Sequence, residues 1–251
     1  MKKNMVSIVV PVYNAASFLE DTIQTVLRQT YPNWELLLVN DCSRDKSVSI
    51  IEKWVKKDTR IRLISQEVNK GAAESRNRGV VEAQGEYLTF LDADDLWEKE
   101  KLERQISFMK EKNCAFSFTG YEFATPDGMP NGKKVYIPSV LSYKKALKNT
   151  TIFTSAVMFH LTLIDKKYIY FPNVPSEDSA CWWSILKRGY TAYGLNEILS
   201  YYRRSENTLS SNKMVAFHRI WNLYYNVEKL GFLKSSYCML CWGFNAVKRR
   251  V

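Results

Sequence analysis

The first part of the chain alternates between short buried strands and amphipathic helices. Residues 6–10 are a nearly continuous β-branched run, which is typical of a strand covered on both faces. Ser17 and Glu20 have the spacing of a capping box at the start of the first helix. Strands are expected at 6–10, 34–39, 61–64 and 87–91, and helices at 17–29, 46–57 and 72–83. Since such alternation requires right-handed crossovers between parallel strands, the sequence predicts an α/β fold with a mostly parallel sheet and flanking helices.

Polar side chains follow three of these strands at the point where each strand ends. Tyr13 and Asn14 follow the first, Asp41 follows the second, and Asp92 and Asp94 follow the fourth. Because ligands of open α/β sheets bind beyond the carboxyl ends of the strands, these side chains are expected to share one site. Carboxylates that converge on such an edge indicate a metal ion or a polyhydroxylated ligand.

Asp92 and Asp94 form a D-x-D pair that is a candidate metal site. Hard divalent cations such as Mg²⁺ or Mn²⁺ take oxygen ligands and bridge substrate phosphates through one or two carboxylates. Asp95 and Glu98 have capping-box spacing for a following helix, which accounts for Asp95 but not for the two other aspartates. Because D-x-D pairs also occur often by chance, the motif alone leaves metal binding and a structural role equally open.

Two further segments could hold ligand-binding or catalytic groups. Residues 69–77 open a helix and carry Arg76, and a helix N-terminus beside an arginine is an anion site, although an ordinary solvated helix is the more frequent case. Asp178 begins another helix, where the helix dipole stabilises carboxylates. The apolar face that follows could raise its pKa toward that of a general base. Of Trp182 and Trp183, one is expected in the core, and the other is open to core packing or to stacking on a sugar.

Charge and composition limit the partners of the chain. Its 251 residues include 36 Lys and Arg against 26 Asp and Glu, a formal net charge of +10. This excess favours anionic partners, whether phosphates, nucleic acid or an acidic membrane face. Five scattered cysteines indicate a reducing compartment. No stretch approaches the ~20 apolar residues of a membrane span, and the N-terminus leads into a strand and not into an export signal, so a cytoplasmic, soluble or peripheral protein is expected.

The ordered motifs resemble those of glycosyltransferase family 2, whose members have the GT-A fold. The resemblance rests on residues 6–14, 29–36, 40–43, 69–79 and 85–95, and it continues more weakly over 176–211. Residues 212–251 are similar to the tail of the glycosyltransferases that build teichuronic acid, capsule and O-antigen polysaccharides. The resemblance implies a Rossmann-like, mostly parallel sheet with flanking helices, followed by C-terminal amphipathic helices.

The resemblance also implies roles for particular residues. The matches to donor-binding positions are Pro11, Tyr13, Asp41, Arg76, Asp92, Arg203 and Arg204. Among them, Asp41 matches a group that accepts the N3–H of uracil or thymine, and Arg76 matches a basic residue near the diphosphate. Arg203 and Arg204 belong to a loop that closes over the diphosphate in the family. Many relatives have His where this chain has Ser205, so one of these two arginines is expected to supply the positive charge.

The chemistry that the resemblance implies is a single inverting displacement. Asp94, with Asp92, matches the ligands of a divalent cation (Mn²⁺ or Mg²⁺) on a nucleotide-diphosphate sugar, expected to be a UDP-sugar. Asp178 matches the base that deprotonates a hydroxyl of a lipid-linked or oligosaccharide acceptor in a growing cell-surface glycan. Two other classes compete with this interpretation. They are a nucleotidyltransferase acting on a sugar phosphate, which needs no separate base, and a basic non-enzymatic module that binds membrane or nucleic acid.

The expected organisation is a catalytic domain followed by a helical tail. Residues 1–211 are expected to form the catalytic domain, with a nucleotide-binding half at 1–110 and an acceptor half at 111–211. Residues 212–251 are expected to form two amphipathic helices broken near Gly231. Basic residues interleaved with Trp, Tyr and Leu describe a segment that lies in an anionic leaflet. Packing of these aromatics onto the catalytic domain has equal weight, whereas no recognition motif supports nucleic acid as a partner.

Overall fold

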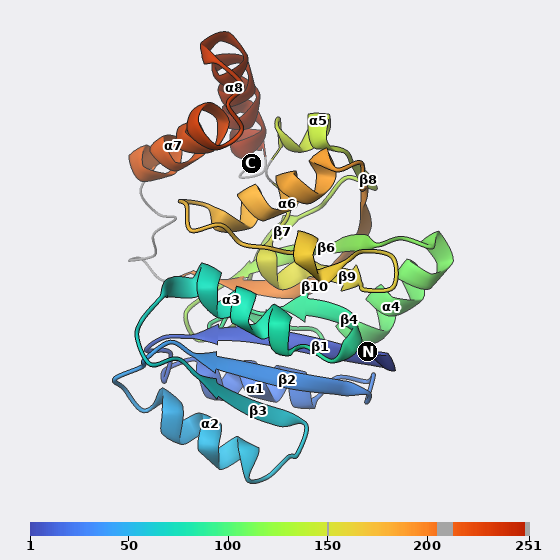
Figure 1. Ribbon diagram of the computed structural model, residues 1–251, viewed down its shortest axis with the longest axis vertical. Helices are drawn as coiled ribbons and strands as arrows, with labels where there is room; N and C mark the ends of the chain where they lie inside the picture. The colour runs from blue at the N-terminus through green and yellow to red at the C-terminus, as the bar shows by residue number, and fades with distance from the viewer. Residues whose placement is uncertain (150, 205–212, 249–251) are drawn as a thin grey trace.

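The computed structural model describes residues 1–149, 151–204 and 213–248, and the side chains of 213 and 246–248 are not described. The described residues form one ten-stranded sheet (Figure 1). Its strand order is β3-β2-β1-β4-β9-β6-β10-β5, and β7 pairs with β6 and β8 with β10. The strands are β1 (Lys2–Val12), β2 (Trp34–Asn40), β3 (Ile61–Ser65), β4 (Gly85–Phe90), β5 (Leu96–Trp97), β6 (Phe116–Ala124), β7 (Pro130–Val135), β8 (Val140–Leu141), β9 (Val157–His160) and β10 (Ala192–Arg203). The helices are α1 (Leu19–Leu27), α2 (Ser47–Val55), α3 (Gly71–Glu82), α4 (Lys101–Lys112), α5 (Tyr143–Ala146), α6 (Glu177–Lys187), α7 (Lys213–Asn222) and α8 (Phe232–Lys248). Short turns of 3₁₀-helix lie at Thr154–Ala156 and Lys166–Tyr168, and a π-helical turn lies at Leu223–Val227.

The direction of the strands determines where a ligand can bind. β3, β2, β1 and β4 are parallel neighbours, and β6 and β10 are parallel to each other. β9 lies antiparallel between β4 and β6, so these six strands all end at the same edge of the sheet. The four other strands of the described chain are shorter or peripheral and run the opposite way. The predicted α/β fold is therefore confirmed, with a parallel N-terminal part and a mixed remainder.

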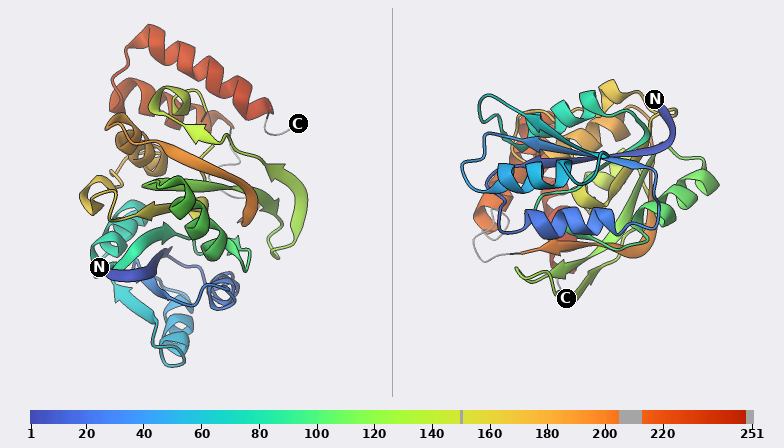
Figure 2. Two further views of the ribbon diagram at one scale, coloured as in Figure 1. Left: turned by 90° about the vertical axis from the view of Figure 1, so that its right-hand side faces the viewer. Right: turned by 90° about the horizontal axis from the view of Figure 1, so that it is seen from below.

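Helices cover both faces of the sheet and form two hydrophobic clusters (Figure 2). One cluster lies between the sheet and α1, α2 and α4, and the other lies between the sheet and α3 and α6. In the second cluster Trp182 packs against Phe90 and Phe171, and its neighbour Trp183 stacks on Tyr224 with ring centroids 5.3 Å apart. Both tryptophans are buried. Core packing therefore explains both of them, and stacking on a sugar is ruled out for Trp183 as well.

Both capping-box predictions were wrong. α1 begins after Phe18 with no side-chain cap, so Ser17 does not cap it. Residues 96–97 form strand β5, and α4 starts only at Lys101. The Asp95 carboxylate is instead buried, where it accepts hydrogen bonds from Ser155 Oγ (2.5 Å) and from the Arg203 N–H (3.3 Å). A local sequence motif contains no information on these distant partners, and Asp95 bonds to them instead of capping a helix.

The C-terminal helices α7 and α8 pack against each other above α6 (Figure 1). The break between them falls at Gly231, as predicted, with a φ of 75° that suits glycine. One face of the pair joins the hydrophobic cluster of α6 through Leu223, Tyr224 and Cys238. No helix in the described part of the chain has the length and hydropathy needed to span a membrane.

Candidate active site

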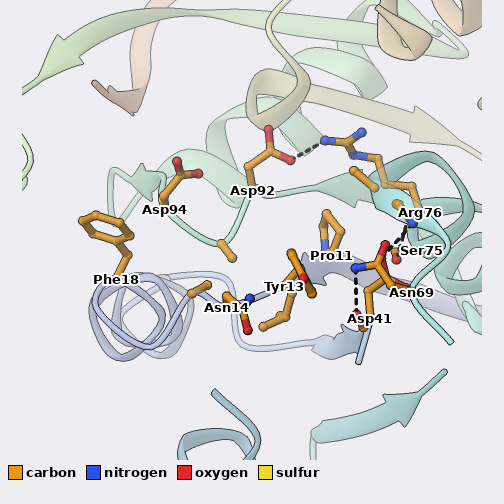
Figure 3. Close-up of a pocket in the computed structure, with 15 residues that line it drawn as sticks. Pro11, Tyr13, Asn14, Phe18, Asp41, Asn69, Ser75, Arg76, Asp92 and Asp94 are labelled. Carbon is orange, nitrogen blue, oxygen red and sulfur yellow. Dashed lines mark hydrogen bonds and ion pairs between the residues drawn. The ribbon is translucent and has the colours of Figure 1, made fainter. Parts of the chain in front are cut away.

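A pocket of about 530 Å³ opens beyond the carboxyl ends of β1, β2 and β4 (Figure 3). The predicted site residues that line it are Pro11, Tyr13, Asp41, Arg76, Asp92 and Asp94. Those side chains come from separate strand ends and from α3, and the parallel topology brings them together. Sequence reasoning missed Phe18, just before α1, and Ser75 on α3, which also line the pocket, because neither side chain stands out chemically in the sequence.

At one end of the pocket, Asp41 is buried against the start of α3. Its carboxylate accepts hydrogen bonds from the N–H groups of Lys70 and Gly71, both at 2.8 Å, and from the Gln66 side chain at 2.9 Å. The helix N-terminus that the sequence offered as a candidate anion site thus binds a carboxylate of its own chain. Tyr13, about half exposed at 52%, lies between Asn14 and Asp41 in the view of Figure 3.

Arg76 is the buried cation at the centre of the site. Its guanidinium bonds Asp92 Oδ1 at 2.6 Å and Glu177 Oε1 at 2.8 Å. Burial alone would lower the pKa of Arg76, but Asp92 and Glu177 together raise it above its ordinary value. The buried Nε–H has no hydrogen-bond partner among the described residues. Arg76 therefore ties the strand end that carries the D-x-D pair to the start of α6, which carries Asp178.

Asp94 differs from Asp92 in having no cation at hydrogen-bond distance within the described chain. Figure 3 shows Asp92 turned toward Arg76 and Asp94 lying apart from it, on the side of Phe18. Burial, followed by the charge of Asp92, raises the pKa of Asp94 to about 6. No group of three or more His, Cys, Asp or Glu within the described residues forms a metal cluster. An uncompensated carboxylate beside a paired one suits a cation that takes its remaining ligands from a substrate.

A short 3₁₀ turn joins the D-x-D loop to Asp178. Ser155 Oγ donates to Asp95 and accepts the Asp92 N–H at 3.0 Å. The adjacent Thr154 donates its hydroxyl to Asp178 Oδ2 at 3.3 Å. Burial, and then the neighbouring Glu177, raise the pKa of Asp178. No sequence pattern indicated Thr154 or Ser155, because their role depends on contacts with residues far away in the chain.

Arg203 and Arg204 do not line the pocket in this structure. Arg203 is buried, pairs with Asp21 at 2.8 Å, and lies 5.3 Å from the Phe18 ring. The Arg204 guanidinium lies over the rings of Phe123 and Tyr202, at 5.1 and 5.8 Å. Ser205 and the rest of the loop expected to close over the diphosphate lie outside the described residues.

Comparison with known proteins identifies the family. Residues 7–170 match the family model of glycosyl transferase family 2. TuaG of Bacillus subtilis strain 168, a glycosyltransferase assigned to teichuronic acid biosynthesis, is 45% identical over 253 residues, which cover 99% of this chain and 98% of the relative. WfgD of Escherichia coli, a UDP-Glc:α-D-GlcNAc-diphosphoundecaprenol β-1,3-glucosyltransferase, is 38% identical over 89% of this chain and 86% of its own.

Solved structures agree on the fold. TarS 1–349 of S. aureus, in complex with UDP-GlcNAc, superposes with a TM-score of 0.70 at 21% identity, over 88% of this chain and 67% of that one. The mannosyltransferase PcManGT of Pyrobaculum calidifontis, in complex with GDP-Man and Mn²⁺, has a TM-score of 0.69 at 18% identity, over 90% and 65% of the two chains. The α/β sheet with its flanking helices is thus the GT-A fold. The chain belongs to glycosyltransferase family 2.

Proposed function

We propose that this glycosyltransferase moves a sugar from a UDP-sugar to a lipid-linked acceptor of a cell-surface glycan, in one metal-dependent, inverting displacement. The observation that carries the proposal is the convergence of Asp41, Arg76, Asp92 and Asp94 on one pocket, with Asp178 joined to it through Glu177 and Arg76. By its name TuaG belongs to teichuronic acid biosynthesis, and WfgD by its name takes UDP-Glc and an N-acetylglucosamine linked to diphosphoundecaprenol. Family membership disfavours the nucleotidyltransferase and the non-enzymatic module.

The residues of the pocket fit a divalent cation. Asp94 is a half-buried carboxylate that forms no ion pair among the described residues, and Asp92 lies beside it. Mg²⁺ and Mn²⁺ are held by one or two carboxylates plus substrate phosphates, so a cluster of three protein ligands is not required. Asp94 is assigned as the direct ligand and Asp92 as its partner. When bound, such a cation stabilises the negative charge of the departing diphosphate.

Asp178 is assigned as the general base. Its raised pKa brings the carboxylate closer to the value at which proton abstraction is efficient near neutral pH. It takes the proton of an acceptor hydroxyl, whose oxygen forms a bond to the anomeric carbon. The bond from that carbon to the diphosphate oxygen breaks, and its electron pair leaves with UDP. A single displacement inverts the anomeric configuration and needs no nucleophile from the protein.

Transfer from UDP-glucose to an N-acetylglucosamine α-linked through diphosphate to a short alkyl chain tests these assignments. UDP release and product mass are followed with Mn²⁺, with Mg²⁺ and with chelator. Asp178→Asn should still bind UDP by calorimetry but transfer at least a thousandfold more slowly, because the amide accepts no proton. Asp165→Asn, an exposed aspartate away from the pocket, is the matched control. Full transferase activity in the presence of chelator would refute the metal dependence. Loss of UDP binding in Asp178→Asn would show that Asp178 binds the donor and does not act as the base.

The C-terminal helices are assigned to peripheral attachment at an anionic membrane face. Leu233, Tyr237, Leu240 and Phe244 recur at spacings of four, three and four residues and are 53–84% exposed, so they form one apolar stripe on α8. Lys148 contacts Tyr237 through its Nζ at 3.0 Å. Lys234, next to Leu233 in the chain, is exposed, and so are Lys144 and Lys145 of α5. An apolar stripe bordered by lysines suits a helix that lies in an anionic leaflet, while the opposite face of the same pair covers α6.

Point substitutions test attachment better than truncation, because removing α7 and α8 would expose Trp183. We expect Leu240→Ser combined with Phe244→Ser to lower binding to phosphatidylglycerol vesicles at least tenfold, since each large side chain loses about 1.5–3 kcal/mol of burial. Val81→Ser removes an equally exposed apolar group from α3 and is the control. Two outcomes would refute membrane attachment and leave α7 and α8 only as a cover for α6. One is equal sedimentation of the wild type, the double variant and Val81→Ser with phosphatidylglycerol vesicles, and the other is equally strong binding of the wild type to neutral vesicles.

A further inference from the structure

Four aromatic side chains cluster near the carboxyl ends of β6 and β10, beyond the strands that form the donor pocket. They are Tyr121 and Phe123 of β6, Phe153 before the 3₁₀ turn, and Tyr202 of β10, and we call them the aromatic platform. Ring centroids are 4.8 Å apart for Tyr121 and Phe153, 4.9 Å for Phe153 and Tyr202, and 5.6 Å for Phe123 and Tyr202. Unlike the buried aromatic core around Trp182, every member of the platform is partly exposed.

The platform lies on the same sheet edge as the donor pocket. β6 and β10 are parallel, with Phe123 opposite Tyr202, and both strands end where β1 and β4 end. Phe153 directly precedes Thr154, whose hydroxyl bonds the Asp178 carboxylate at 3.3 Å. The platform is therefore one residue away from a group that contacts the assigned base, on the side away from the pocket of Asp41.

The chemistry of the platform suits a carbohydrate. Aromatic rings present broad apolar faces and attract positively polarised hydrogens, and the C–H groups on one face of a pyranose ring are of this kind. The Arg204 guanidinium over Phe123 and Tyr202 adds a positive charge at the rim, which suits a sugar linked to a diphosphate. The platform is not needed to cover the hydrophobic core, because Trp182 already packs on Phe116 and Phe159 between α6 and the sheet.

We infer that the aromatic platform is the acceptor subsite, where the terminal sugar of the acceptor stacks so that its hydroxyl reaches Asp178. The inference rests on the proposed function, because it takes Asp178 as the base. It assigns specificity for a hexose-type acceptor to Tyr121, Phe123, Phe153 and Tyr202, which all lie in the expected acceptor half at 111–211.

Substitution of Tyr202 separates ring stacking from bulk. Tyr202→Leu keeps an apolar side chain but removes the ring face, Tyr202→Phe keeps the ring, and Tyr136→Leu makes the same change at an exposed tyrosine outside the platform. In transfer from UDP-glucose to the alkyl-diphosphate N-acetylglucosamine, Tyr202→Leu should raise the KM of the acceptor about tenfold, while the KM of UDP-glucose stays at the wild-type value. Tyr202→Phe and Tyr136→Leu should keep the wild-type KM of the acceptor.

A binding measurement without turnover separates this inference from the proposed function. Saturation of aromatic protons in the protein with UDP bound should transfer to the ring protons of methyl N-acetyl-α-D-glucosaminide, and Tyr202→Leu should lose most of that signal. Absence of any transferase activity in the wild-type protein would refute the proposed function, whereas the saturation signal would still test the platform. The inference would be overturned if a folded Tyr202→Leu variant kept the wild-type saturation transfer and the wild-type KM of the acceptor. It would also be overturned if the variant raised the KM of UDP-glucose and not that of the acceptor.

Discussion

Asp94→Asn is expected to make the metal-free protein more stable while it removes activity. The folded pKa of Asp94 is raised from 3.8 to about 6 by burial and by Asp92. A carboxyl whose pKa is higher in the folded than in the unfolded state holds its proton more tightly when folded. Its contribution to stability therefore falls as pH rises from about 4 to about 6, and stays low above that range. The amide of asparagine resembles the protonated carboxyl and carries no such penalty.

The size of the effect follows from the two pKa values. One unit of pKa is worth about 1.4 kcal/mol, so the rise from 3.8 to about 6 corresponds to a cost of about 3 kcal/mol at neutral pH. No hydrogen bond to another described side chain is lost, because Asp94 makes none. For a chain of this size about 1 kcal/mol moves the unfolding temperature by about 2–4 °C. Asp94→Asn should therefore raise the Tm by about 6–12 °C at pH 7.5 and by much less at pH 4.

Thermal unfolding of chelator-treated protein at pH 4.0, 5.0 and 7.5 measures the effect. Addition of Mn²⁺ and UDP should then raise the Tm of the wild type but not that of Asp94→Asn, and transfer by the variant should fall by orders of magnitude. Glu67→Gln, at an exposed position, is the control for loss of one negative charge. A Tm gain that is absent at pH 7.5, or that is equal at pH 4.0 and 7.5, would refute the electrostatic reasoning. A variant that Mn²⁺ and UDP stabilise like the wild type would refute the assignment of Asp94 to the metal.

Three further variants probe the groups around the site. Arg76→Gln leaves Asp92 and Glu177 without their buried cation and should lower the free energy of unfolding by about 3–5 kcal/mol in urea titrations; an unchanged midpoint would show that the pairs contribute nothing. Thr154→Val removes a hydrogen bond to the Asp178 carboxylate, so its pKa should rise and the acid limb of the pH–rate profile should move to higher pH; a profile identical to the wild type would contradict this. Burial lowers the pKa of Lys101 well below its ordinary value, so wild-type stability should fall as pH drops below about 10 toward the folded pKa. In Lys101→Met the free energy of unfolding, measured by denaturant titration, should no longer fall between pH 10 and pH 7. An equal fall in the wild type and in the variant would refute the explanation.

The sequence was sufficient for those parts of the site that depend on chain periodicity. Buried β-branched runs and helical spacing placed Asp41, Asp92 and Asp94 at strand ends, and parallel topology then required these ends to meet. The pocket that they line follows from those two facts alone. The positions of the donor-side carboxylates could therefore be predicted from the amino-acid sequence.

The sequence was insufficient wherever a role depends on a partner far away in the chain. Asp95 and Glu98 had the spacing of a helix cap, yet Asp95 binds Ser155, which is 60 residues away. Arg76 pairs with Asp92 and with Glu177, which is 101 residues away, and no pattern in the sequence indicated these two partners. Side chains of this kind look alike in sequence, because charge and hydrogen-bonding capacity do not reveal which buried group will be their partner.

The order of the strands gives the site a direction. Along the sheet edge, β1 and β4 carry the pocket assigned to the donor, and β6 and β10 carry the aromatic platform assigned to the acceptor. The 3₁₀ turn that precedes β9 lies between them and connects both sides, since Ser155 bonds Asp92 and Asp95 while Thr154 bonds Asp178. Arg76 makes a second connection through Asp92 and Glu177. Two sets of contacts therefore hold Asp92 near the segment that carries Asp178, one through the 3₁₀ turn and one through Arg76. In the proposed reaction the sugar moves along the edge of the sheet, from the donor pocket at β4 toward the platform at β6. The assigned base, Asp178, is held between them by its hydrogen bond to Thr154.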